Sequence, residues 1–400
     1  KFNITSTIPK IEFKKQLVKN FNVVLHNTNE DLRFSTYFEY GKKSPVQFDI
    51  QSVVESDSLQ LNIQLKDHTS SMHIGDIQLS TNFSKDEEDQ LITKISLLPS
   101  NFWFKEQKWD IKESNIICKK KSFTFENFRL QNLECFLNID GIVSDKEDER
   151  VTISANKIDL NEIFSILNVK NFSLGGILNG NIYGETLLKN PHINASLDID
   201  EFKLNDTPYG NLFLLSNWND KEQQIDLDAY LIKDNDFPAV IKGYINPKKD
   251  EIDININAQD FSLAFIRQYL TSFSSDFNAN ITGDVKFVGS LRHPYILANA
   301  YARNGRIKID YLGTTYTFED SIHSDQRGLV FDNITIYDKQ NHQGTLEGII
   351  YHSFFKNLMF GLNIKSKNMM LIDTKFADNN LFYGTAYGSG SAQIYGNSEN

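Results

Sequence analysis

Apolar and polar residues alternate with a period of two along almost the whole chain. Between residues 59 and 66, Leu and Ile occupy the odd positions, while Gln, Asn and Lys occupy the even ones. Successive residues of a strand point to opposite faces, so each such segment has one apolar face and one polar face. Antiparallel sheets with one solvated face show this pattern, whereas parallel sheets covered by helices show solid apolar runs. The pattern predicts an all-β chain built on an antiparallel sheet.

Short connections and few helices fit the same interpretation. Gly, Pro, Asn and Asp favour tight turns, and they cluster between alternating segments at Tyr40–Lys43, Asn217–Asp220 and Asn246–Asp250. Apolar residues at helical spacing occur only over short stretches. They predict two short helices, at Leu160–Leu167 and Leu263–Leu270.

An internal repeat is visible when the chain is shifted by 103 residues, the separation between Ile153 and Ile256. At the same offset Gly180 corresponds to Gly283. Each unit holds a strand, a short helix and a glycine-marked strand that leads into further strands. Because stacked units grow along one axis, we expect an elongated sheet rather than a closed globule. The predicted parts are an N-terminal part of the elongated sheet at 1–150, repeats at 151–253 and 254–361, and a truncated third repeat at 362–400.

Composition excludes several classes of protein. The 400 residues carry 41 Lys and Arg against 52 Asp and Glu, a formal net charge of −11, whereas nucleic acids and anionic membranes attract basic surfaces. No apolar run approaches the roughly 20 residues that a transmembrane helix needs. The chain begins at Lys1 without Met or a signal peptide. We therefore expect it to be part of a longer protein, with any membrane anchor outside it.

Residue patterns typical of enzymes and metal sites are missing from the sequence. The eight histidines are scattered singly, and the closest two are His68 and His73. Carboxylates two residues apart lie on one face of a strand, which favours solvated side chains over an acid–base pair or a calcium site. Such pairs are Asp198 with Asp200 and Asp226 with Asp228. No phosphate loop or dinucleotide fingerprint occurs, so we predict no enzymatic activity, no cofactor and no metal.

Two further groups of residues have alternative interpretations. Cys118 and Cys135 would face each other, and could form a disulfide, if the chain turned at Glu126–Asn127; otherwise they are free, partly buried thiols. A cluster of aromatic residues favours core packing over a ligand cage. Its members are Phe102, Trp103, Phe104 and Trp109.

The repeats resemble the TamB family of the bacterial translocation and assembly module, in its Bacteroidota form and within the AsmA-like superfamily. The resemblance rests on Leu178–Leu212 and its echo Ile281–Phe318, on Ile153–Leu167, and on Asn379–Asn400. It covers roughly residues 100–400 well and the first hundred weakly. It implies a β-taco, a long antiparallel sheet folded lengthwise into a U-shaped groove with an apolar interior and a few short helices.

The resemblance also implies a function. Members are similar to bridge-like lipid transfer proteins, which carry phospholipid acyl chains along a hydrophobic groove. This chain would be one segment of a bridge that crosses the periplasm and is anchored in the inner membrane in the full-length protein. The implied partners are phospholipids and, through regions outside this chain, an outer-membrane barrel insertase of the TamA/BamA type. The implied roles are outer-membrane biogenesis and the assembly or secretion of outer-membrane proteins.

On this interpretation, the apolar residues of the alternating strands line the groove. They are Leu59, Leu61, Ile63, Leu65, Ile193, Leu197, Ile199, Ile225, Leu227, Leu231, Ile252, Ile254, Ile256, Val285, Phe287, Ile307, Ile309, Ile334, Ile336, Leu358, Phe360, Leu362 and Ile364. In a closed barrel or a sandwich the same residues would form an ordinary core. Two other functions stay open: a repetitive β surface scaffold, and a periplasmic chaperone that offers sheet edges to nascent outer-membrane proteins.

Overall fold

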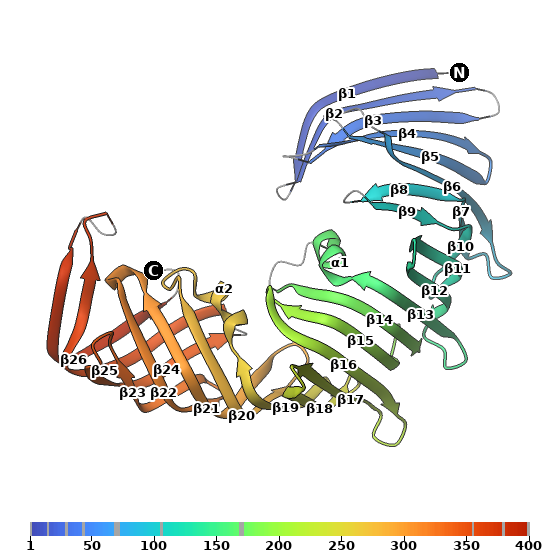
Figure 1. Ribbon diagram of the computed structural model, residues 1–400. Coiled ribbons are helices and arrows are strands. Elements are labelled where there is room, and N and C mark those ends of the chain that lie inside the picture. Colours follow the sequence, from blue (N-terminus) through green and yellow to red (C-terminus); the bar gives the residue numbers. More distant parts are fainter. Residues whose placement is uncertain are drawn as a thin grey trace. The chain divides into compact units, whose positions relative to one another are not determined.

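The computed structural model describes residues 2–13, 16–28, 31–41, 45–67, 73–104, 107–167, 172–353, 356–377 and 381–397. Within these residues the chain is almost entirely β-strand, and 26 strands form one antiparallel sheet (Figure 1). The described helical segments are short: α1 (Leu160–Leu167), η1 (Ala264–Ile266) continued by α2 (Arg267–Leu270), and η2 (Asp310–Leu312). The predicted all-β, antiparallel fold class is confirmed.

Most strands pair with their neighbours in sequence, while β6 pairs with both β7 and β8, and β11 with both β9 and β10. The first thirteen strands are β1 (Phe2–Phe13), β2 (Gln16–Asn27), β3 (Leu32–Tyr40), β4 (Val46–Glu55), β5 (Ser58–Asp67), β6 (His73–Lys85), β7 (Leu91–Leu97), β8 (Ser100–Phe104), β9 (Gln107–Ile111), β10 (Ser114–Lys119), β11 (Ser122–Asn132), β12 (Cys135–Ser144) and β13 (Arg150–Asp159). The others are β14 (Leu174–Glu185), β15 (His192–Leu204), β16 (Thr207–Asn219), β17 (Gln224–Lys233), β18 (Asp236–Asn246), β19 (Glu251–Ser262), β20 (Phe277–Gly289), β21 (Pro294–Ile309), β22 (Thr314–Asp325), β23 (Gly328–Tyr337), β24 (Gln343–Ser353), β25 (Lys356–Thr374) and β26 (Gly384–Asn397).

Most local predictions agree with these bounds. The helix Leu160–Leu167 is confirmed, and Leu263–Leu270 contains a 3-10 turn followed by one α-helical turn. The turn after Asn246 separates β18 from β19 as predicted. The turn predicted at Asn217–Asp220 begins later, because Asn217 to Asn219 still pair with β17. The turn predicted at Tyr40–Lys43 lies partly outside the described residues.

The chain divides into two compact units. Unit 1 comprises Lys1–Ile158 and Asn179–Ile193, and unit 2 comprises Asp159–Leu178 and Asn194–Asn400. The elements also recur in sequence: a helical segment follows β13 and, six strands later, follows β19.

Bulges interrupt a set of strands that all run in the same direction. From β11 onward, seven odd-numbered strands each contain one non-glycine residue with φ between 50° and 57°, in the left-handed region. Asn and Asp tolerate this conformation better than other side chains, and they occupy five of the seven positions. Each bulge bends the strand that carries it, so the bulges of unit 2 bend the sheet of that unit along a line. The residues are Asn127, Lys157, Glu201, Asp260, Asn304, Asn333 and Asn368.

A side chain from the next strand stabilises six of these bulges in the same way. It accepts a hydrogen bond from the backbone N–H of the bulged residue, as Asp140 Oδ1 does from Asn127 at 2.9 Å and Ser389 Oγ does from Asn368 at 2.8 Å. In β13, β15, β19 and β21 the N–H of the bulged residue donates to a side-chain oxygen of Asn179, Asn211, Thr282 and Glu319, respectively. These side-chain acceptors replace the backbone hydrogen bond that the N–H of the bulged residue loses.

Glycine often lies beside a bulge in the paired strand. Gly283 pairs with Ala258 next to the β19 bulge and has φ of 148°, and Gly348 pairs with Phe331 next to the β23 bulge with φ of 137°. A Cβ atom on Gly348 would lie 2.1 Å from the Gly361 carbonyl oxygen. The bends therefore combine glycines such as Gly283 on one strand with bulged residues such as Asn304 on the partner strands.

Candidate functional site

One row of paired residues crosses all twelve strands from β15 to β26, and it places side chains on a single face of the sheet in every strand but β26, where the residue is glycine. The paired residues in this row, which we call the apolar stripe, are Leu197, Leu214, Ala229, Ile241, Ile256, Val285, Ala298, Ser324, Leu329, Ile350, Phe360 and Gly396. Eleven strand spacings of about 4.8 Å give it a contour length of about 50 Å. Ser324 is its one polar side chain, and the Ser324 hydroxyl donates to the Ile296 carbonyl oxygen at 2.6 Å. The stripe therefore presents no unsatisfied polar side chain.

Most residues predicted to line the groove lie in the stripe or in rows beside it. Strand pairing places Ile199 beside Leu212, Leu231 beside Ala239, Ile254 beside Phe287, and Leu362 beside Gly348, all on the face of the stripe. Alternation along the strands adds Ile193, Ile225, Leu227, Ile252, Leu358 and Ile364. Beyond their bulges, β21 and β23 return to this face with Ile307, Ile309, Ile334 and Ile336.

The predicted residues of unit 1 form a separate group on β5. Leu59, Leu61, Ile63 and Leu65 share one face, where Ile63 pairs with Ile50 and Ile77. The same face contains Ser52, which pairs with Leu61, is 4% exposed and has a hydroxyl oxygen without a hydrogen-bond partner. This part of the apolar face is thus interrupted by a buried polar atom.

In unit 2 the face that carries the stripe is concave. Tyr209 on β16 stacks on Phe261 of β19 with ring centroids 4.8 Å apart, and its hydroxyl donates to the Ser262 carbonyl at 2.8 Å. In a flat sheet, strands three positions apart would be about 14 Å apart. Phe273, which adjoins the end of β21, meets Phe360 of β25 with centroids 5.4 Å apart. Inward curvature brings β16 and β19 together, and it brings the connection that contains Phe273 over β25.

The stripe is only half covered, although its residues are apolar. Among its twelve members only Ala229, 1% exposed, is fully buried, and ten are of intermediate exposure. Full burial is concentrated near the bulges, in clusters that include Tyr209, Ala302 and Met369, although single residues away from them, such as Ile225 and Ile296, are also buried. On the concave face, the residues near the bulges are therefore tightly packed, while the residues of the apolar stripe are partly exposed.

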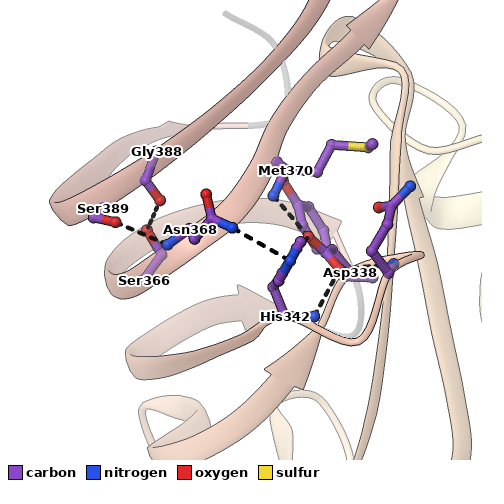
Figure 2. A network of polar contacts seen from close by, with 9 residues as sticks. Asp338, His342, Ser366, Asn368, Met370, Gly388 and Ser389 are labelled. Carbon is purple, nitrogen blue, oxygen red and sulfur yellow. Dashed lines mark hydrogen bonds and ion pairs between the residues drawn. The ribbon is translucent and has the colours of Figure 1, made fainter.

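A polar network fixes the bulge of β25 to the hairpin between β23 and β24 (Figure 2). Asp338 Oδ2 accepts from the Met370 N–H at 2.8 Å and lies 2.9 Å from His342 Nδ1. Asp338 Oδ1 accepts from the N–H groups of Gln340 and His342, at 2.8 Å and 2.9 Å. Burial disfavours the charged form, but these hydrogen bonds outweigh it and hold the pKa of Asp338 below its ordinary value.

The network continues toward the edge strand β26. His342 Nε2 lies 3.3 Å from Asn368 Nδ2, and the Ser366 hydroxyl donates to the Gly388 carbonyl at 3.3 Å (Figure 2). Asn368 is the bulged residue whose N–H is held by Ser389. The network therefore holds the last bend of the sheet by polar contacts, while Met369 packs beneath it, fully buried.

The disulfide alternative is wrong, because the chain does not turn at Glu126–Asn127. These residues lie inside β11 at a bulge, and the turns fall on either side of that strand. Cys118 pairs with Phe123 and Cys135 with Asn132, and both thiols are free.

The remaining sequence candidates are spread over the fold. Trp109 is buried at 8% exposure and pairs with Phe102, which favours core packing, whereas Trp103 is 41% exposed. Asp198 and Asp228 lie exposed on the face opposite the stripe. His68 is outside the described residues.

Two findings on metal ions and membranes concern the part of the chain that the structure describes. Its His, Cys, Asp and Glu residues form no group of three or more that could hold a metal ion. None of its helices has the length and apolar character to cross a membrane. Comparisons with protein-family models, curated protein sequences and solved structures found no match for this chain.

Proposed function

We propose that the concave apolar face binds the acyl chains of phospholipids and lets them move along the sheet. The observation that carries the proposal is the continuity of the apolar stripe across twelve strands, with its one hydroxyl bonded to the backbone. The half-open state of the stripe supports it, because a sandwich core would bury the same residues.

The energetics of such a face suit a conduit rather than a single binding site. Each methylene group removed from water contributes about 0.8 kcal/mol, so an acyl chain is held by many weak contacts. Neighbouring strands contribute similar side chains to the stripe, such as Ile241, Ile256 and Val285. A chain shifted by one strand therefore exchanges one set of contacts for an equivalent set, and its free energy changes little.

The resemblance to the TamB family extends the proposal to the cell. There the chain acts as a segment of a periplasmic lipid-transfer bridge between inner and outer membrane that supports outer-membrane biogenesis and protein assembly. Its partners are phospholipids and, through regions outside this chain, a barrel insertase of the TamA/BamA type.

Photo-crosslinking from two adjacent residues tests the proposal. A photoreactive amino acid at Ile256 lies in the stripe, and one at Asn255 lies on the opposite face between Lys242 and Lys286. Irradiation in cells should attach phospholipid at position 256 and little at position 255. Absence of lipid at position 256 in a folded protein would overturn the proposal and leave these residues as core.

A further inference from the structure

Several exposed aromatic rings lie on the polar face of unit 2, the face opposite the apolar stripe, and Phe237, Tyr301 and Tyr337 are those that border notches in it. Tyr301 and Tyr337 are 41% and 36% exposed, and each follows in sequence a buried residue of the apolar face, Ala300 and Ile336. Phe237, 49% exposed, packs against Tyr230 of the polar face with ring centroids 5.9 Å apart. Single exposed rings are common on protein surfaces, so the place of these three beside concave notches is the informative feature.

The rings border two notches that the bulges of β19 and β21 open in this face. The notch at β19 has a volume of about 520 Å³ and is lined by Phe237, Gln259, Asp260 and Thr282, among others. The notch at β21 has a volume of about 680 Å³ and lies between Tyr301 and Tyr337. Thr282 is paired directly with Tyr301, so the two notches adjoin.

The polar side chains of the β21 notch lie in one row across four strands. Asn278, Arg306, Thr317 and Tyr337 are successive partners from β20 to β23. Arg306 is paired with Asp276 at 3.0 Å, so the notch does not offer a free cation to an anionic ligand. Asp236, Asp260 and Glu319 add negative charge around the two notches. This balance disfavours anionic ligands, and the amide, hydroxyl and carboxylate groups of the notches suit a ligand with many hydroxyl or amide groups.

Spacing indicates an extended ligand. Phe237, Tyr301 and Tyr337 lie on β18, β21 and β23, so strand separations of about 4.8 Å put them about 14 Å and about 10 Å apart along the sheet. A sugar ring has an apolar C–H face that packs on an aromatic ring and an edge of hydroxyl groups that bonds to amides and carboxylates. We propose that Phe237, Tyr301 and Tyr337, with the two notches, form a binding track for an uncharged oligosaccharide.

Saturation-transfer NMR with chitotetraose and with cellotetraose tests the inference on the whole chain. Signals from at least one of the two sugars should appear, and the double variant Tyr301→Ala, Tyr337→Ala should weaken binding by about 5- to 100-fold, since each ring contributes about 0.5–1.5 kcal/mol. Tyr351→Ala is the matched control, because Tyr351 is a 37% exposed tyrosine outside the two notches. Its affinity for the sugar should stay unchanged.

Three results would overturn the inference: no transfer to either sugar, equal weakening in the double variant and the control, or equal binding of a polyanionic glycan such as hyaluronan. The double variant should keep its lipid, because the rings and the stripe are on opposite faces of the sheet. Failure of the oligosaccharide track is therefore separable from failure of the lipid groove.

Discussion

Replacement of Ile256 by aspartate is the most direct test of the apolar stripe. Ile256 lies half-buried between Ile241 and Val285. One strand spacing of about 4.8 Å corresponds to roughly four methylene groups of an extended acyl chain. A carboxylate that stays hydrated at this rung removes their contacts, at about 0.8 kcal/mol each, or about 3 kcal/mol in total. We therefore expect Ile256→Asp to retain about a hundredfold less lipid at that rung.

Asn255→Asp is the matched control for this experiment. Asn255 is next in sequence but points to the polar face, where it pairs with Lys242 and Lys286, so a new carboxylate there faces two cations. A photoreactive amino acid at Val285, the stripe partner of Ile256, measures lipid at that rung in each variant by the yield of crosslinked phospholipid, and circular dichroism reports the fold. If Ile256→Asp fails to fold, Ile256→Asn provides a polar but uncharged replacement. Equal lipid content in a folded position-256 variant and in Asn255→Asp would refute the reasoning.

Three further predictions concern the bends and the buried polar groups. Gly348→Ala should lower the free energy of unfolding by about 2 kcal/mol or more, because the new Cβ would lie 2.1 Å from a carbonyl oxygen. Gly361→Ala should lower it less, because the nearest atom to its Cβ is 3.9 Å away. Thermal melts of the two variants test the difference. Ser52→Ala should raise the free energy of unfolding by about 1 kcal/mol by removing an unpartnered buried hydroxyl; an unchanged or lower urea midpoint would contradict this. Because the folded pKa of Asp338 is depressed, its contribution to stability is present above about pH 4 and is lost as the pH falls further. Asp338→Asn should therefore flatten the fall in melting temperature between about pH 4 and about pH 2.

The alternation in the sequence was enough to predict the fold class and the residues that share a face within each strand. Ile252, Ile254 and Ile256 point the same way because side-chain direction depends only on the local period. Which residue faces which across strands depends on register, which alternation alone leaves undefined. The pairing of Ile256 with Val285, and hence the continuous stripe, could therefore not be derived from the sequence.

The bulges had a detectable signal that the sequence interpretation missed. In β21 the apolar positions are even up to Ala302 and odd from Gly305 onward, so the phase of the alternation changes at Asn304. In β11 it changes at Asn127, between Phe125 and Phe128. A change of phase at an Asn inside a strand predicts an inserted left-handed residue. The side chains that accept from the bulge N–H, such as Ser389, come from the next strand and have no comparable local signal.

The difference between a core and a lined groove follows from where burial is concentrated. Ala302 and Met369 are 0% exposed, and both lie at bulges, where the curved sheet packs on itself. Val285 and Ile256 lie away from that line and keep intermediate exposure. If packing at the bends supplies the stability, the floor of the concave face does not need a complementary layer of its own. Substitutions at Met369 should then act mainly on unfolding, and substitutions at Val285 mainly on the bound lipid, whereas in a closed core both would act on unfolding alike.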